Sequence, residues 1–265
     1  MIRSFAFACA YWGLSVAYVL VALPCLAIPG DGTIRWLIKR YTHSMRWSLR
    51  VLGGVSHDIR GRENLPDGPF VIAAKHQSWG DGFLIYPEID NLAFVTGDHL
   101  EKFPFVKGIL RKLGAIVIDT CGGGERKAAS LAEGMHRAAE EGRRVLIYPE
   151  GHLAPVDYHF KYKAGVWHMA KAMDVPVIPV ATNIGLFWKQ EDFRKQKGTA
   201  IVEFLPALSS ELPKTEFLDT LTSRIEAKTA ELVAEGRGSE VVAPQLIPDP
   251  QKGELAQVPC EQTPA

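Results

Sequence analysis

The longest apolar stretch of the chain lies at its amino terminus. Residues Phe5–Ile28 carry no charge, and about 20 apolar residues suffice for a helix to cross the hydrocarbon core of a bilayer. The run exceeds the ~7–15 apolar residues of a cleaved signal peptide. Gly13 and Ser15 interrupt it and Pro24 lies near its end, so a kinked, partly inserted hairpin is the alternative to a spanning helix. We predict that residues 1–32 form a membrane-embedded helix or hairpin.

A second helical pattern follows a turn rich in glycine. Apolar residues recur at helical spacing from Ile34 to Leu52, and the segment contains no acidic residue. Basic and aromatic residues surround this stripe: Arg35, Trp36, Lys39, Arg40, Arg46, Trp47 and Arg50. We predict that residues 33–54 form a basic amphipathic helix lying on anionic lipid. The alternative is a helix that packs its stripe on the rest of the protein and leaves its basic face in water.

Short apolar runs alternate with amphipathic stretches from Val55 onward. Continuous apolar runs are typical of strands buried on both faces of a sheet, and they occur at Phe70–Ala74, Leu92–Val95, Ala115–Ile118, Val145–Tyr148, Val177–Ala181 and Ala200–Leu205. Helical spacing predicts helices at Glu125–Glu141, Gly165–Met173 and about Thr215–Glu235. The alternation predicts an α/β fold over residues 55–238, with a mixed, mostly parallel sheet flanked by helices.

Composition predicts a disordered tail and argues against nucleic-acid binding, a disulfide framework and a zinc site. Residues 239–265 are rich in Pro, Gln and Glu and have little to bury, so we predict a disordered tail. The formal net charge is zero and the pI is about 7.1, which gives no global field to attract nucleic acid. The cysteines are scattered and suggest neither a disulfide framework nor a zinc site; they are Cys9, Cys25, Cys121 and Cys260.

The candidate chemistry follows the first predicted strand, at residues 75–81. Five positions on one helix would separate His76 from Asp81 by about 140°, so the two side chains can meet only across a turn. Ser78 and Gly80 supply turn residues. An aspartate that holds an imidazole in one tautomer makes it a general base for a hydroxyl group near neutral pH. His76 and Asp81 are therefore candidates for a catalytic dyad, and the alternative from these residues alone is a structural histidine.

The same spacing occurs a second time, at His152 and Asp157. The pattern alone does not choose between the two pairs. We favour His76 because open α/β sheets expose their reactive groups where strands end.

Four sequence blocks occur in order along the chain. They are His76-Gln77-Ser78-Trp79-Gly80-Asp81, Val117-Ile118-Asp119-Thr120, Tyr148-Pro149-Glu150-Gly151-His152-Leu153 and Val175-Pro176-Val177-Ile178-Pro179-Val180. With the segment Asn183–Trp188, they make the region from about Val51 to Pro206 resemble the glycerophospholipid acyltransferase family typified by bacterial 1-acylglycerol-3-phosphate acyltransferase. That family carries His-x-x-x-x-Asp, then blocks like Phe-Ile-Asp-Arg, Phe-Pro-Glu-Gly-Thr-Arg and Val-Pro-Val-Ile-Pro-Val.

The resemblance implies an enzyme that works at a membrane. It implies that His76 and Asp81 move a fatty acyl group directly onto the hydroxyl of a lysophospholipid such as 1-acylglycerol-3-phosphate, in phospholipid biosynthesis or remodelling. The expected donor is acyl-CoA or acyl carrier protein, without a cofactor or metal. If residues 1–32 span the membrane, the basic residues that follow place the enzyme on the cytoplasmic face of the inner or plasma membrane.

The acceptor site departs from the family pattern. Thr120 stands where the family has arginine, His152-Leu153 stands where it has Thr-Arg, and a lysine usual between the first two blocks is replaced near Thr96–Asp98. Such cations bind the acceptor's phosphate in the family, so a different head group, as in a lyso-ornithine lipid, is the alternative. The candidate substrate-binding residues are Lys75, Ser78, Thr120, Glu150, Gly151 and His152; Arg126, Lys127, Lys161 and Lys163 are candidate replacement cations.

Two further alternatives remain open. His76-Gln77-Ser78-Trp79-Gly80 is one glycine short of a Gly-x-Ser-x-Gly elbow, which would make Ser78 the nucleophile of a lysolipid hydrolase. The altered cation positions also allow a homologue that binds lipid without turnover.

Overall fold

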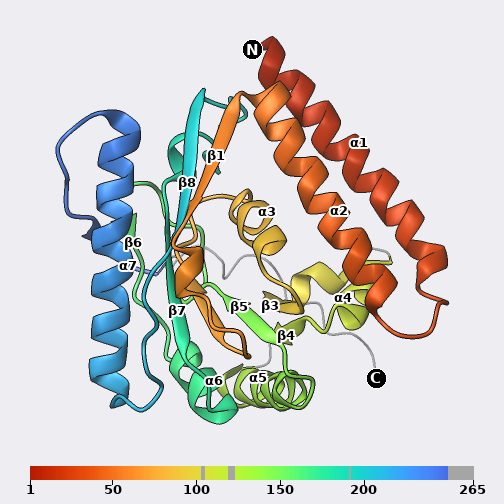
Figure 1. Ribbon diagram of the computed structural model, residues 1–265, viewed down its shortest axis with the longest axis vertical. Coiled ribbons are helices and arrows are strands. Elements are labelled where there is room, and N and C mark those ends of the chain that lie inside the picture. Colours follow the sequence, from red (N-terminus) through yellow and green to blue (C-terminus); the bar gives the residue numbers. More distant parts are fainter. Residues whose placement is uncertain (103–104, 119–122, 191, 250–265) are drawn as a thin grey trace.

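The computed structural model describes residues 1–102, 105–118, 123–190 and 192–249, arranged in three layers (Figure 1). The middle layer consists of β1 (Val55–Arg60), β2 (Val71–Ala74), β3 (Leu92–Gly97), β4 (Ile116–Ile118), β5 (Arg144–Ile147), β7 (Val177–Thr182) and β8 (Gly198–Phe204). These strands form a seven-stranded sheet in the order β1-β8-β7-β2-β5-β3-β4. Only the neighbours β7 and β8 are antiparallel, which confirms the predicted mostly parallel α/β sheet.

All six predicted strands are present, and β1 is the strand of the seven-stranded sheet that the apolar pattern missed. It lies at the edge of the sheet beside β8. Only Val55 and Ile59 are buried in β1, whereas the residues between them are partly exposed. An edge strand with one covered face needs no continuous apolar run, so β1 left no strong pattern.

Helices cover both faces of the sheet. They are α1 (Ile2–Cys25), α2 (Gly32–Ser48), α3 (Asp81–Ile85), α4 (Val106–Lys112), α5 (Gly123–Glu140), α6 (Gly165–Met173) and α7 (Lys214–Arg237). A π-helical turn spans Leu49–Gly53, and 3-10 turns span Arg62–Asn64, Tyr86–Glu88, Asp98–Lys102 and Ile184–Leu186. One core lies between the sheet and α1, α2 and α3, and the other between the sheet and α5, α6 and α7.

The central strand β2 divides these two cores. Ile72 and Ala74 belong to the core under α1, α2 and α3, whereas Val71 and Ala73 belong to the core under α5, α6 and α7. Successive side chains of a strand point to opposite faces. The two residues after β2 therefore enter opposite sides of the sheet, provided the extended backbone continues.

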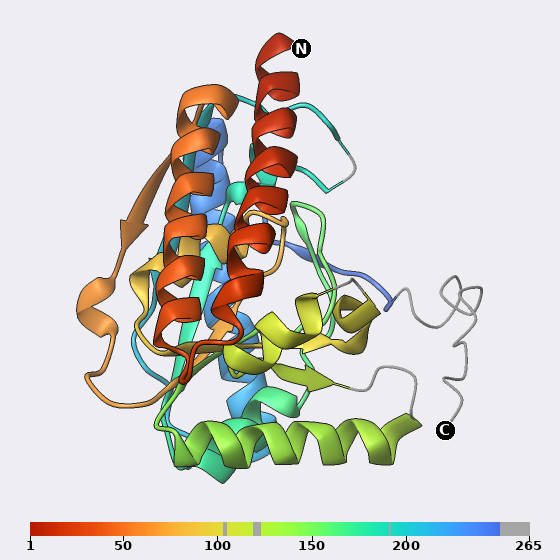
Figure 2. The same cartoon turned by 90° about the vertical axis from the view of Figure 1, so that its right-hand side faces the viewer.

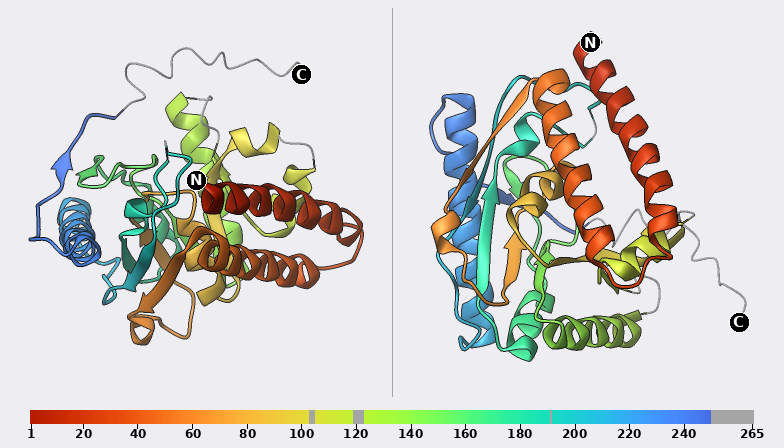
Figure 3. Two further views of the ribbon diagram at one scale, coloured as in Figure 1. Left: turned by 90° about the horizontal axis from the view of Figure 1, so that it is seen from above. Right: turned by 45° about the vertical axis from the view of Figure 1, so that its right-hand side comes forward.

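The two amino-terminal helices form an antiparallel hairpin along one side of the protein (Figures 2 and 3). Side-chain hydrogen bonds of 2.9 Å join Ser15 to Tyr41 and Tyr18 to Ser44. The helix α1 is long and apolar enough to cross a membrane. Its outer face exposes large apolar side chains, among them Phe5, Trp12, Val16 and Leu20.

The apolar stripe of α2 corrects the prediction that this face lies on lipid. Ile34, Leu37 and Met45 are almost fully buried within the protein. Arg46 is also buried and pairs with Glu88 at 2.6 Å. The structure therefore favours the alternative of a packed helix, because the stripe contacts α1 and the α/β domain. Trp36 and Trp47 remain exposed on the outer side of α2.

Part of the tail that we predicted to be disordered packs on the domain. Gln245–Leu246 form β9, which pairs in parallel with β6 (Tyr158–His159). The amide of Gln245 donates to Asp157 O at 2.8 Å, and that of Ile247 donates to His159 O at 2.9 Å. These main-chain bonds order the segment despite its polar composition. Residues 250–265 lie outside the described residues.

Candidate active site

A tight turn joins the end of β2 to α3 and carries the predicted dyad. The amide of Asp81 donates to Ser78 O at 3.2 Å, and the amide of Gly80 donates to Ser78 Oγ at 3.0 Å. Asp81 is the first residue of α3. The turn folds the chain back on itself, so five positions in sequence become a contact in space.

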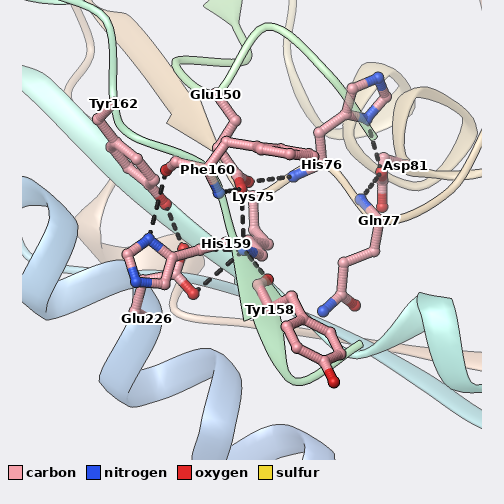
Figure 4. A network of polar contacts seen from close by, with 10 residues as sticks. All are labelled: Lys75, His76, Gln77, Asp81, Glu150, Tyr158, His159, Phe160, Tyr162 and Glu226. Carbon is pink, nitrogen blue, oxygen red and sulfur yellow. Dashed lines mark hydrogen bonds and ion pairs between the residues drawn. The ribbon is translucent and has the colours of Figure 1, made fainter. Parts of the chain in front are cut away.

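The dyad forms as predicted from the spacing (Figure 4). His76 Nδ1 lies 2.9 Å from Asp81 Oδ2. The same oxygen accepts hydrogen bonds of 2.9 Å from the amides of Gln77 and Ser78, and Asp81 is fully buried. Three donors thus hold the carboxylate, which in turn orients the imidazole and leaves Nε2 to exchange a proton with a substrate.

The imidazole is also held from its face. The rings of His76 and Tyr148 stack with centroids 3.8 Å apart and planes 14° apart. Burial, assisted by the negative charge of Asp81, raises the pKa of Tyr148 well above its usual value, so the phenol stays neutral. The side chain of His76 keeps 22% of its surface exposed, enough for a substrate to reach it. The stacking role of Tyr148 was missed, although the residue opens the third sequence block.

Glycines let other segments close on the turn. A Cβ at Gly80 would lie 2.7 Å from the indole of Trp188. Gly185 donates its amide to Gln77 Oε1 at 3.3 Å, and a Cβ there would lie 2.9 Å from the Cβ of Gln77. The segment Asn183–Trp188 therefore supports the turn from one side. Beside Gln77 and Gly185 lies a cavity of about 670 Å³, whose polar lining includes Lys189, Lys197 and Arg237.

Ser78 does not have the geometry of an exposed nucleophile. Its side chain is fully buried and its Oγ accepts the amide of Gly80. A hydrolase with Ser78 at an elbow would need that oxygen to face its substrate. The buried Oγ of Ser78 therefore stabilises the turn, and the expected role of Ser78 in substrate binding stays a prediction.

Lys75 and Glu150 also lie away from any open site. Both are completely buried, and Lys75 Nζ lies 3.1 Å from Glu150 Oε2. Because β2 directs Lys75 and His76 to opposite faces of the sheet, Lys75 turns towards α7. Both side chains are held within the protein here, and their expected role in substrate binding stays a prediction.

The loop that contains the third sequence block and Ala154 contacts the main chain of His76. The amide of Ala154 donates to His76 O at 2.7 Å. Gly151 has a φ of +74°, a backbone conformation that favours glycine, and a Cβ there would lie 2.7 Å from the end of the flexible Lys163 side chain, Nζ. Lys163 is thereby brought next to the position at which the family carries a cation.

A carboxylate from the tail occupies this place. Asp249 lies 3.1 Å from His152 Nε2 and 3.4 Å from Lys163 Nζ through its two oxygens. The sequence could not show that Lys163 and Asp249 share a site, because 86 positions separate them. Thr120, the remaining candidate for acceptor binding, lies outside the described residues.

The second His–Asp spacing does not form a dyad. The carboxylate of Asp157 accepts two hydrogen bonds, of 2.8 and 2.7 Å, from the guanidinium of Arg237. His152 instead faces Asp249. Within the described ranges, no group of three His, Cys, Asp or Glu side chains could hold a metal ion.

Comparisons with known proteins agree with this geometry. The family model described as Acyltransferase matches residues 56–183. A 1-acyl-sn-glycerol-3-phosphate acyltransferase from Pseudomonas aeruginosa is 31% identical over 226 residues, which cover 84% of this chain and 85% of that protein. A lyso-ornithine lipid O-acyltransferase from the same species is 29% identical over 106 residues, 40% of this chain and 39% of that one.

One solved structure supports the fold. The crystal structure of the 1-acyl-sn-glycerophosphate acyltransferase PlsC from Thermotoga maritima superimposes with a TM-score of 0.72. It is 19% identical and covers 88% of this chain and 97% of that chain. The two proteins therefore share the arrangement of sheet and helices described above.

Proposed function

Because the chain belongs to the acyltransferase family, we propose that it moves a fatty acyl group from a thioester to the free hydroxyl of 1-acylglycerol-3-phosphate or a related lysophospholipid. The product would serve phospholipid biosynthesis or remodelling. The observation that carries the proposal is the contact of 2.9 Å between His76 Nδ1 and Asp81 Oδ2, on an imidazole that remains partly exposed. This intact dyad supports turnover over mere lipid binding.

The proposed reaction is a direct transfer. His76 Nε2 takes the proton of the acceptor hydroxyl while its oxygen attacks the thioester carbonyl, and Asp81 stabilises the imidazolium that forms. Backbone N–H groups hold the oxyanion of the tetrahedral intermediate. The carbon–sulfur bond then breaks, and the imidazolium returns the proton to the departing thiolate. The products are the ester and a free thiol.

The donor in this proposal is acyl-CoA or acyl carrier protein. A thioester is already activated for acyl transfer, and the imidazole carries both proton transfers. The proposed chemistry therefore uses neither a metal nor an organic cofactor.

For the acceptor we propose an anionic head group bound between His152 and Lys163. The support is the carboxylate of Asp249, which lies within 3.4 Å of both side chains and marks a place where an anion is held. His152 is two residues from Glu150 and from Ala154, and both of these contact the main chain of His76. The acceptor phosphate would displace Asp249. A lyso-ornithine lipid remains the second candidate, supported by the partial similarity to an enzyme named for that lipid.

We propose that the enzyme works at the cytoplasmic face of a membrane, anchored by α1. The support is the exposed apolar face of α1, together with the exposed side chains of Trp36 and Trp47 on α2. Exposed Arg40 and Arg50 follow α1 in the chain, and positive charge next to a membrane segment favours the cytoplasmic side.

A transfer assay tests the proposal. Purified protein in phospholipid vesicles would receive labelled acyl-CoA or acyl carrier protein with lysophosphatidate, lysophosphatidylcholine or lyso-ornithine lipid in turn. We expect ester formation that is greatest with lysophosphatidate, that is lost in His76→Ala, and that persists in the matched variant His136→Ala, at an exposed histidine of α5. Release of free fatty acid without an acceptor, or full activity of His76→Ala, would contradict the proposal.

A further inference from the structure

A group of charged and polar side chains is sealed behind the dyad, on the α7 side of the sheet (Figure 4). This buried cluster consists of Lys75, Glu150, Tyr162 and Glu226, which are exposed by 0, 0, 4 and 5%. Glu150 belongs to the third sequence block described above, and Lys75 directly precedes the first. Tyr162 and Glu226 belong to none of them, and Glu226 comes from the middle of α7.

Lys75 is the centre of the buried cluster. Its Nζ donates to Glu150 Oε2 at 3.1 Å, to Glu226 Oε1 at 2.9 Å and to the carbonyl of Tyr158 at 2.9 Å. An ammonium group has three N–H donors, so these acceptors satisfy all of them. The hydroxyl of Tyr162 donates to the same Glu226 Oε1 at 2.7 Å.

Glu150 connects the buried cluster to the dyad. Its Oε2 also accepts the amide of Phe160 at 2.9 Å, while its Oε1 lies 3.4 Å from the amide nitrogen of His76. Lys75 precedes His76 directly in the chain. The buried cluster thus holds the backbone of His76 twice, through the covalent link to Lys75 and through its amide.

Burying the charges of this cluster costs free energy that apolar side chains in the same place would not cost. Two carboxyl groups face one ammonium, and an uncompensated charge is costly to bury. Burial raises the pKa of Glu150 to about 7, against the opposing effect of Lys75, which fits a cluster that binds an extra proton. Because apolar side chains often stabilise a core equally well, the geometry that these hydrogen bonds impose is the better reason for the charged set.

We propose that the buried cluster positions the main chain of His76 for acyl transfer, with Glu226 and Tyr162 as positioning residues. This inference rests on the proposed function. Neither side chain touches the imidazole, so each acts through the partner that it holds. Loss of Glu226 leaves Lys75 with an incomplete set of acceptors and allows the segment that carries His76 to move.

The variant Glu226→Gln tests the inference, because it keeps the size of the side chain and removes its charge. We expect kcat to fall about tenfold to hundredfold, the range that a small misplacement of a catalytic group produces. The KM values for donor and lysolipid should change less than twofold, since the substrates do not contact Glu226. Glu226→Asp should recover part of kcat. The matched control is Glu231→Gln, which removes an exposed ion pair with Lys228 on the same helix and should leave kcat unchanged.

Tyr162→Phe provides a second variant if Glu226→Gln does not fold. It removes one hydroxyl and should lower kcat about threefold to tenfold, because Glu226 then loses one of its two side-chain partners. Wild-type kcat in folded Glu226→Gln or in Tyr162→Phe would overturn the inference. A melting temperature that falls without any change in kcat would assign the buried cluster to stability alone and would overturn it too.

A spectroscopic measurement separates this inference from the proposed function. The side-chain ¹⁵N signals of His76 in labelled protein report its surroundings without turnover. We expect them to shift in Glu226→Gln and in Tyr162→Phe but not in Glu231→Gln. Unchanged signals would overturn the inference even if the wild-type enzyme transfers acyl groups, whereas an inactive wild type with shifted signals would contradict the proposed function only.

Discussion

Two consecutive residues of this protein enter two different polar regions. Lys75 turns into the buried cluster, where it is completely buried, whereas the side chain of His76 keeps 22% of its surface exposed. Both regions hold a carboxylate that contacts the same short segment, Asp81 on one side and Glu150 on the other. The alternation of a strand is what separates them.

The difference shows how burial assigns a role to a charged group. A sealed group can fix a position but cannot exchange a proton with a substrate, whereas an exposed imidazole with one nitrogen held can do so. Two consecutive residues thus differ in role, because His76 is placed to react and Lys75 to hold a position. Experiments can disturb one region at a time.

The largest effect on acyl transfer should come from a change in the partly exposed dyad of His76 and Asp81. Asp81→Asn keeps the size of the side chain but replaces a carboxylate by an amide, which no longer stabilises an imidazolium. We expect kcat/KM for acyl transfer to fall by about 10³-fold or more. Asp90→Asn, which changes an exposed aspartate paired with Lys39, is the control and should stay near wild type. A rate for Asp81→Asn within threefold of wild type would remove the carboxylate from the mechanism.

A smaller effect should appear at the head-group site. Lys163→Met should raise the KM for lysophosphatidate about tenfold, because one charge-assisted hydrogen bond is worth about 1.4 kcal/mol or more. The neighbouring exposed lysine, Lys161, provides the control variant Lys161→Met.

The tail provides the opposite change at the same site. Asp249→Asn removes the negative charge that pairs with His152 and Lys163. The phosphate of lysophosphatidate then displaces a neutral side chain, so the KM for lysophosphatidate should fall about threefold. Initial rates across a range of lysophosphatidate concentrations measure both changes. Equal KM values in Lys163→Met, Asp249→Asn and wild type would place the head group elsewhere.

In the buried cluster, protonation of Glu150 should make the free energy of unfolding depend on pH. The pKa of Glu150 is raised from 4.5 to about 7 in the folded protein, so the folded state binds more protons than the unfolded state between these values. The stabilisation from this group is therefore complete below about pH 4.5 and is lost as the pH rises through 7. We expect the free energy of unfolding to fall by up to about 1.4 kcal/mol per pH unit in this window.

Unfolding measured from pH 5 to 8 in wild type and Glu150→Gln checks this expectation. The neutral amide should remove the slope. Glu141→Gln, at a partly exposed glutamate that pairs with Arg143, should keep it. The same slope in wild type and Glu150→Gln would show that another group titrates.

Sequence could predict the open region more fully than the closed one. The spacing of His76 and Asp81 after an apolar run carries enough information for a turn, because local geometry allows few other contacts. The contacts of Glu226 depend on how α7 packs over the sheet, about 150 positions from Lys75. A glutamate beside the apolar side of that helix was the one available signal.

The other differences between prediction and structure also arise where contacts between distant segments decide the outcome. The strands β2 and β7 are buried on both faces and have continuous apolar patterns, whereas the edge strand β1 does not. The segment of β9 is held by main-chain bonds to β6, which composition does not encode. The stripe of α2 was recognised, but its partner depended on the tertiary arrangement of α1 and the domain.

The tautomer of His76 tests the central claim most directly. Side-chain ¹⁵N spectra of histidine-labelled protein, with His76 assigned by its loss in His76→Ala, distinguish a protonated from an unprotonated ring nitrogen. The account predicts that in the neutral imidazole Nδ1 carries the proton, donated to Asp81, while Nε2 is unprotonated and able to accept the proton of a hydroxyl. A neutral imidazole protonated at Nε2 would contradict it, because that nitrogen could not act as the base.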